Sequence, residues 1–97
     1  MSLNRYAKKR DANEPKIIEA LEKAGATVQR IDVPCDLVIG FRGRNYLGEV
    51  KQGKAKLTKN QADFVAQWRG QKPFVFRTVE DVIEWVNDPA WRTGMDV

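Results

Sequence analysis

Three residues near the middle of the chain have side chains that could work together in catalysis. Glu49 and Lys51 are two positions apart, and Asp36 lies 13 residues before Glu49. In a β-strand, residues two apart project from the same face, so a carboxylate and an ammonium would stand together. Two carboxylates at the end of a strand pair favour a hard cation such as Mg²⁺, and a nearby lysine can orient water and hold a phosphate. This set predicts metal-assisted hydrolysis of a phosphodiester bond.

The same residues also have a plain structural explanation. A Glu-x-Lys on a strand commonly forms a surface ion pair that contributes about 0 to 1 kcal/mol. The context favours chemistry, because Glu49 follows the apolar Tyr46-Leu-Gly48 and a lysine-rich loop begins directly after Lys51.

The first half of the chain must supply the strands that carry these residues. Asn13-Glu14-Pro15 predicts a helix start with Asn13 as its cap, and Gly25 predicts its end. The apolar face of this helix is predicted to be Ile17, Ile18, Leu21 and Ala24. Strands are predicted at 27–33, 36–40 and 46–51, with a turn at 42–45, so that the second and third form a hairpin.

The second half predicts two helices around one short strand. Capping boxes at Thr58/Gln61 and Thr78/Asp81 predict helices that run to about Arg69 and Asn87, with a strand at 73–77 between them. Their predicted apolar stripes are Phe64, Val65 and Trp68 in the first and Val79, Val82, Ile83 and Val86 in the second. The order helix, three strands, helix, strand, helix predicts one mixed α/β domain over residues 1–97, with irregular ends at 1–10 and 88–97.

Composition narrows the functional classes. The single Cys35 excludes an internal disulfide, and the absence of histidine excludes a mixed Cys/His zinc site, so any metal must be held by oxygen. The chain has neither a long apolar run nor a signal-peptide pattern. We therefore expect no membrane partner and a soluble, intracellular protein, in the cytoplasm of a bacterial host if the chain comes from a phage.

The charge pattern favours an anionic partner. The net charge is +4, and basic residues cluster at Arg5, Lys8, Lys9 and Arg10 and again at Lys51, Lys54, Lys56 and Lys59. Solvated loop lysines would give the same pattern, so both explanations stay open on charge alone. The candidate residues for nucleic-acid binding are Arg10, Lys54, Lys56 and Lys59.

The motif around these residues resembles a known superfamily. Pro34-Cys-Asp36 and Glu49-Val-Lys51 resemble the two parts of the PD-(D/E)XK nuclease motif, although the proline lies two positions before the aspartate instead of next to it. More narrowly, the chain resembles compact phage-type VRR-NUC (virus-type replication-repair nuclease) domains. The likeness runs from about Arg10 to Val86 and includes Asn13-Glu14 and Leu57-Thr-Lys-Asn-Gln61.

This resemblance implies a restriction-endonuclease-like core, a mixed central sheet flanked by helices. It implies that Asp36, Glu49 and the Val50 carbonyl bind Mg²⁺ or Mn²⁺, and that Glu14 approaches the metal from the first helix. It also implies that Lys51 is catalytic and that Gln61 lies beside the centre.

Several residues have a second explanation. Glu14 would also be favoured by the helix dipole in a first turn, and Gln61 would also complete a capping box. Trp68 and Trp85 fall near apolar helix faces and are predicted to be core residues, whereas Trp91 is the freer candidate for stacking on a base or packing against a second subunit.

Small nucleases that resemble this chain commonly act as two-fold dimers, and one active centre makes paired cuts only in a dimer. We therefore expect a homodimer that cuts branched DNA such as a four-way junction or a flap. The alternatives are a non-catalytic nucleic-acid-binding module, whose binding ignores metal, and an assembly protein with incidental positive charge.

Overall fold

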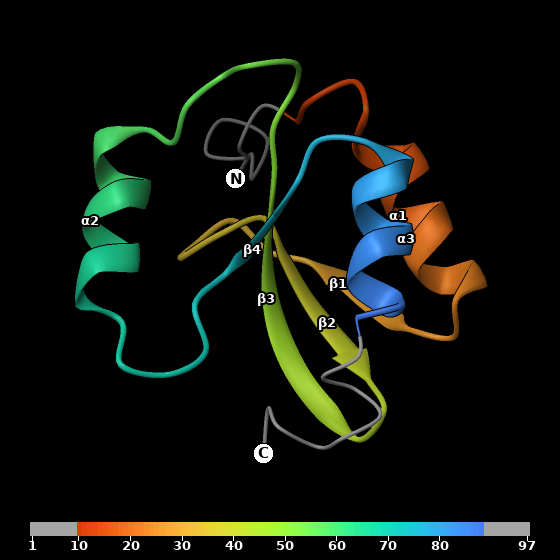
Figure 1. Cartoon of the computed structure of the whole chain (residues 1–97). Coiled ribbons are helices and arrows are strands. Elements are labelled where there is room, and N and C mark those ends of the chain that lie inside the picture. The colour runs from red at the N-terminus through yellow and green to blue at the C-terminus, as the bar shows by residue number, and fades with distance from the viewer. Residues whose placement is uncertain (1–9, 89–97) are drawn as a thin grey trace, which may run out of the picture.

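The computed structural model of the protein describes residues 10–88 and has the predicted order of elements (Figure 1). The elements are α1 (Glu14–Lys23), β1 (Thr27–Arg30), β2 (Leu37–Phe41), β3 (Arg44–Val50), α2 (Lys59–Gln67), β4 (Phe74–Phe76) and α3 (Val79–Val86). The predicted basic segment with Arg5, Lys8 and Lys9, and the tail with Trp91, lie outside the described residues. Within 10–88, no helix has the length and apolar character needed to cross a bilayer.

The four strands form one mixed sheet in the order β1-β2-β3-β4. The first three strands pair antiparallel, and β4 pairs parallel to β3. In the β2–β3 hairpin, Phe41 pairs with Arg44, so only Arg42 and Gly43 form the turn, with φ of 53° and 80°. Two positive φ angles are typical of a tight type I′ turn, which explains why β3 begins earlier than predicted.

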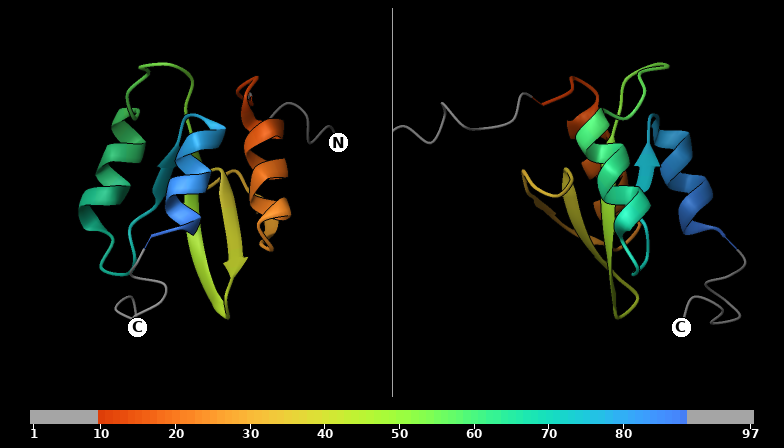
Figure 2. Two further views of the ribbon diagram at one scale, coloured as in Figure 1. Left: turned by 45° about the vertical axis from the view of Figure 1, so that its right-hand side comes forward. Right: turned by 90° about the vertical axis from the view of Figure 1, so that its left-hand side faces the viewer.

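The helices lie on both faces of the sheet. Helices α1 and α3 pack side by side on one face, and α2 lies beyond the other (Figures 1 and 2). Alternate residues of β2 and β3 point toward α1 and α3 and are buried there with the apolar side of those helices. Trp85 is the centre of this core, with ring centroids 5.2 to 5.6 Å from Phe41, Tyr46, Phe74 and Phe76. The prediction that Trp85 is a core residue is confirmed.

The predicted first strand is too long. It was expected to continue to Val33, but β1 ends at Arg30. Because Arg30 pairs with Leu37, residues 31–36 are needed for the connection between the strands. The N–H of Ile31 donates to the carbonyl of Asp36 at 2.7 Å and closes this loop, which contains a cis Val33–Pro34 peptide bond. Asp36 therefore lies at the end of the loop, one residue before β2.

The ends of α1 differ in how well they were predicted. Gly25, with φ of 103°, follows the helix, and the N–H of Ala26 donates to the carbonyl of Leu21 at 3.0 Å, which is a Schellman ending. Asn13 is the N-cap residue, as predicted, but its side chain makes no capping hydrogen bond. Ala24 is exposed at the C-cap and does not extend the apolar face.

Both capping boxes are present, but two of the predicted apolar positions are wrong. Val82 and Trp85 form the side of α3 that faces the core. Ile83 does not lie on this side and is 52% exposed. Trp68 was predicted to be core and is 43% exposed. Helix α2 ends at Gln67 and buries none of its residues fully. An open hollow of about 270 Å³ lies between Trp68 and the hairpin residues Val38 and Leu47, so the sheet does not cover the indole.

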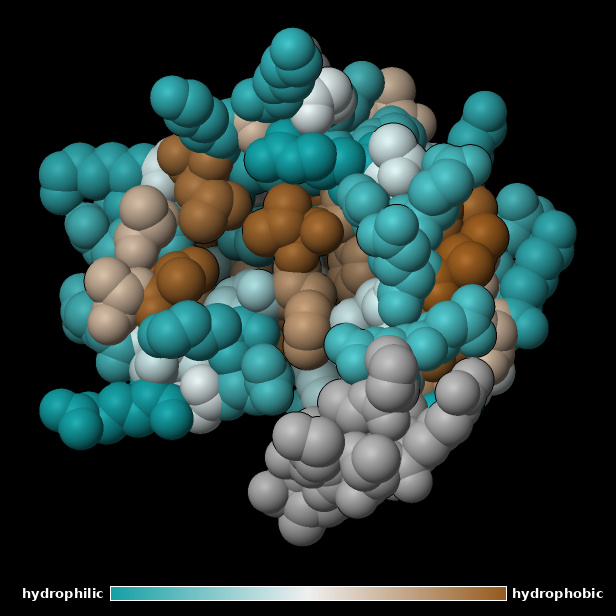
Figure 3. Space-filling view, viewed as in Figure 1, coloured by the Kyte–Doolittle hydropathy of each residue, from teal (hydrophilic) through white to brown (hydrophobic). Residues whose placement is uncertain are grey.

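Apolar side chains therefore remain on the α2 side of the molecule. Val33, Trp68 and Val75 are all exposed. Figure 3 shows apolar surface in the middle of this face, between α2 and the sheet.

Candidate active site

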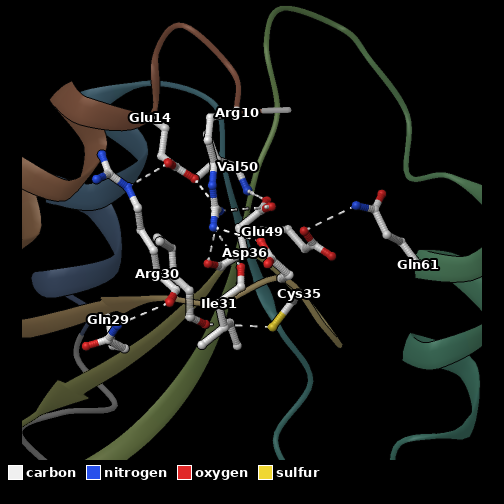
Figure 4. Close-up of polar contacts among 12 residues, drawn as sticks. Arg10, Glu14, Gln29, Arg30, Ile31, Cys35, Asp36, Glu49, Val50 and Gln61 are labelled. Atoms are coloured by element: carbon white, nitrogen blue, oxygen red, sulfur yellow. Dashed lines mark hydrogen bonds and ion pairs between the residues drawn. The ribbon is translucent and has the colours of Figure 1, made fainter. Parts of the chain in front are cut away.

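Asp36 is fixed against the strand that carries Glu49. Its backbone N–H donates to the carbonyl of Gly48 at 3.1 Å, and its Oδ2 accepts the backbone N–H of Val50 at 2.7 Å. The residue is only 6% exposed. The carboxylate of Asp36 therefore lies beside Val50, the residue that follows Glu49, as Figure 4 shows.

Glu49 lies near the end of β3 and is 1% exposed. Its Oε1 accepts a hydrogen bond from Nε2 of Gln61 at 3.3 Å. Oε1 of Gln61 accepts the N–H of Thr58 at 2.8 Å, and the N–H of Gln61 donates to Oγ1 of Thr58 at 3.2 Å. One amide thus completes the capping box of α2 and reaches Glu49 from the opposite element. Gln61 is therefore both a capping residue of α2 and a neighbour of Glu49.

Lys51 is the first residue after β3. Its N–H donates to the carbonyl of Phe76 at 3.1 Å, so the parallel pairing with β4 continues to this position. Strand alternation then places the Lys51 side chain on the face of the sheet that carries Glu49. The carbonyl of Lys51 accepts Nδ2 of Asn13 at 2.9 Å, and the same Nδ2 donates to the carbonyl of Arg77 at 2.8 Å. The amide of Asn13 therefore ties the start of α1 to the ends of β3 and β4.

Glu14 lies in the first turn of α1 and is 1% exposed. Each of its carboxylate oxygens pairs with an arginine. Oε1 accepts Nε of Arg30 at 2.9 Å, and Oε2 accepts a guanidinium N–H of Arg10 at 3.1 Å. The structure therefore places two sequence candidates, Glu14 and Arg10, in direct contact, and adds Arg30, which the sequence patterns did not single out. Sequence patterns do not indicate a functional role for Arg30, because arginine is an ordinary residue on an exposed strand face.

Cys35 is fully buried next to Asp36. The pKa of its thiol is raised to about 11, first by burial and then by the negative charges of Glu49 and Asp36, against the lowering effect of the Leu37 backbone contact. The Sγ donates to that carbonyl at 3.7 Å. The thiol is therefore protonated at neutral pH and is neither a nucleophile nor a metal ligand in this state.

The lysine-rich loop between β3 and α2 is held by Arg77. One guanidinium nitrogen donates to the carbonyls of Gly53 at 2.9 Å and Ala55 at 2.7 Å. Lys54 and Lys56 are exposed on this loop. Lys59, in the first turn of α2, pairs with Asp63 at 3.0 Å. Arg77 is a second residue that the sequence patterns did not indicate, because its partners are backbone carbonyls far along the chain.

The donor set suits only certain metals. Within residues 10–88, no three Asp, Glu, Cys or His side chains are grouped so that they could hold an ion. Asp36, just before β2, and Glu49, in the adjacent β3, remain as two carboxylates. Mg²⁺ is commonly held by one or two carboxylates and keeps several waters, so this oxygen set fits Mg²⁺ or Mn²⁺ better than a metal that needs a complete protein cage.

A hollow lies next to these residues on the α2 side. It has a volume of about 320 Å³ and lies between the 31–36 loop and α2, lined by Asp32, Val33, Pro34, Asn60, Gln61 and Phe64. Gln61 thus lines this hollow and also donates a hydrogen bond to Glu49.

In comparisons with known proteins, no family model, no curated protein and no solved structure matches this chain.

Proposed function

We propose that this chain is a divalent-metal-dependent DNA endonuclease of the PD-(D/E)XK type, similar to compact VRR-NUC domains. The observation that carries the proposal is the hydrogen bond from the Val50 N–H to Asp36 Oδ2 at 2.7 Å. It brings the Asp36 carboxylate to the end of β3, where Glu49 and Lys51 flank Val50. Both carboxylates are buried, and buried ionisable groups are frequent at functional sites.

Each residue then has a role. Asp36, Glu49 and the Val50 carbonyl would hold Mg²⁺ or Mn²⁺, which supplies Lewis acidity that stabilises charge on phosphorus and activates water. The Lys51 ammonium holds a phosphate oxygen of the scissile group and orients the attacking water. The Gln61 amide fixes the rotamer of Glu49 through its hydrogen bond.

DNA binding in this proposal depends on the basic side chains next to the centre. Lys54 and Lys56 are exposed on a loop that Arg77 holds in place, and Lys59 opens α2. Lysines in this arrangement would contact the phosphate backbone on the side from which Lys51 acts.

We further propose a homodimer and a branched DNA substrate. The exposed Trp68, Val75 and Val33 on the α2 side support an association surface. Light scattering of the full chain bound to a four-way junction is expected to give the mass of the junction plus that of two chains of 11.1 kDa each. The mass of the junction plus that of a single chain would remove the dimer from the proposal and leave the nuclease assignment to be judged by cleavage.

The nuclease assignment is tested by cleavage of labelled four-way-junction, flap and linear duplex DNA with Mg²⁺ or Mn²⁺, and with EDTA as the metal-free control. Glu49→Gln is expected to lower the rate on the order of 10²-fold or more, because it removes a charge at the reacting centre. Glu80→Gln, an equal change at an exposed position of α3, is the matched control and should leave the rate unchanged.

One observation favours a second candidate, a non-catalytic nucleic-acid-binding module. Both oxygens of Glu14 already pair with arginines, and the described residues hold no group of three metal-binding side chains. The binding module predicts tight DNA binding that EDTA does not alter, with no cutting of any substrate. For this module, Lys51→Ala would remove one phosphate contact and lower the salt dependence of binding, whereas for the nuclease it would abolish cutting.

A further inference from the structure

The guanidinium of Arg10 has five oxygen contacts at the edge of the candidate active site. One terminal nitrogen lies 3.1 Å from Oε2 of Glu14, 3.4 Å from the carbonyl of Asp36 and 3.8 Å from Oδ1 of Asp36. The other lies 3.1 Å from both the carbonyl of Ile31 and Oδ1 of Asp32. Three carboxylates and two carbonyls therefore surround a single side-chain cation. Figure 4 shows Arg10 between Glu14 and Asp36.

Arg30 differs from Arg10 although both pair with Glu14. Arg30 uses its Nε on Glu14 Oε1, and its side chain is 51% exposed. Arg10 contacts the other oxygen and extends to Asp36, and its side chain is 28% exposed. Loss of Arg10 would thus leave Glu14 paired with Arg30 but would remove a positive charge beside Asp36 Oδ1.

We propose that Arg10 is the resident cation of this acidic centre: its guanidinium neutralises Glu14 and Asp36 in the metal-free protein and competes with a divalent ion for them. The inference rests on the proposed function, because it assumes that Asp36 is a metal ligand. The two Oδ atoms of Asp36 support it, since Oδ2 is engaged by the Val50 N–H and Oδ1 is the oxygen that faces Arg10.

The competition follows from charge and geometry. A divalent ion that binds Asp36 would lie close to a fixed positive charge, and like charges at a short distance repel strongly in a half-buried site. Metal binding must therefore be coupled to movement of the guanidinium away from Asp36. Such coupling is reciprocal, so removing the guanidinium must tighten metal binding.

The test is the affinity of the full chain for Mn²⁺ without DNA, measured from the electron paramagnetic resonance signal of free Mn²⁺. Arg10→Gln is expected to bind Mn²⁺ about tenfold or more tightly than the unchanged protein. Arg69→Gln removes the same charge from an exposed position just beyond α2 and should change the affinity less than about twofold. Equal or weaker Mn²⁺ binding by Arg10→Gln would overturn the proposal.

Thermal unfolding gives a second readout that does not depend on cutting. In EDTA, Arg10→Gln should melt at a lower temperature than the unchanged protein, because Glu14 and Asp36 each lose one cationic partner. Saturating Mn²⁺ should remove most of that difference. If Arg10→Gln does not fold, Arg10→Met serves instead, because it removes the same charge while keeping an unbranched apolar stem; it too must bind Mn²⁺ more tightly, and unchanged affinity would overturn the proposal.

Two further variants separate this inference from the proposed function. If Asp36→Asn and Glu49→Gln leave Mn²⁺ affinity unchanged, the metal centre itself is wrong, and the Arg10 inference is overturned with it. If they weaken Mn²⁺ binding while Arg10→Gln does not strengthen it, the metal centre stands and only the role of Arg10 is overturned.

Discussion

The carboxylate of Asp36 accepts the backbone N–H of Val50 at 2.7 Å, and this bond joins the loop before β2 to the end of β3. The hydrogen bond has two consequences. It brings the Asp36 carboxylate next to Val50, the residue that separates Glu49 from Lys51, and it satisfies a buried backbone donor at the end of the sheet. Asp36 is therefore expected to matter for stability as well as for cutting.

Substitutions at Asp36 should separate these two roles. Asp36→Asn keeps an oxygen that can accept the Val50 N–H, so it should abolish cutting with a small loss of stability. Asp36→Ala leaves that buried N–H without its acceptor and should lower the free energy of unfolding by a further ~1 to 3 kcal/mol. Urea denaturation of both variants in EDTA measures the difference. Equal stabilities would show that the hydrogen bond is not important for the fold.

Gln61 is expected to affect cutting beyond its role as a helix cap. Gln61→Ala and Thr58→Ala both break the capping box of α2, and each should lower stability by about 1 kcal/mol. Only Gln61→Ala also removes the donor to Glu49, and hydrogen bonds to charged groups are worth about 1.5 to 3 kcal/mol. The cleavage rate should therefore fall about tenfold or more in Gln61→Ala relative to Thr58→Ala. The same rate in both variants would reduce Gln61 to a capping residue.

Arg77 is predicted to act on DNA binding through the loop that carries Lys54 and Lys56. Arg77→Gln removes two hydrogen bonds to loop carbonyls, so the loop samples more conformations and DNA affinity falls. Lys56→Gln, which removes a proposed phosphate contact, should lower the slope of log affinity against log salt by about 1. For Arg77→Gln, the affinity should fall with little change in that slope, measured by fluorescence anisotropy at several salt concentrations. A slope change equal to that of Lys56→Gln would make Arg77 a direct phosphate ligand.

Sequence patterns predicted most of the fold because capping, turn and helix-stop signals involve residues that are close together in the sequence. The capping boxes at Thr58 and Thr78 and the stop at Gly25 depend on residues within one or two turns, and all three are present. Trp68 was mispredicted for the opposite reason. Its burial depends on how closely α2 approaches the sheet, and spacing along one helix contains no information about that distance.

The candidate site was predictable only in part. Period-two spacing predicted one face for Glu49 and Lys51, and the predicted hairpin placed Asp36 at the end of β3, where it accepts the Val50 N–H. The partners that hold these residues are separated by long stretches of chain, as Arg10 is from Asp36 and Asn13 from Lys51. Asn13 is an example, because asparagine is a residue type that favours helix caps, yet its side-chain amide donates to two carbonyls that are distant in the sequence.

Cys35 should make the stability of the metal-free protein fall at high pH. The folded-state pKa of about 11 lies above the ordinary thiol pKa of 9.0, so between these values the unfolded chain has lost the thiol proton that the native chain keeps. Stability from this difference is fully present below pH ~9 and is lost as the pH rises through ~11. In EDTA, the stability difference between the unchanged protein and Cys35→Ala should be constant from pH 6 to 8 and should shrink by about 1 to 3 kcal/mol toward pH 11. The comparison cancels the titration of lysines and tyrosines that both proteins share. A difference that stays constant up to pH 11 would mean that the thiol titrates alike in the folded and unfolded chains.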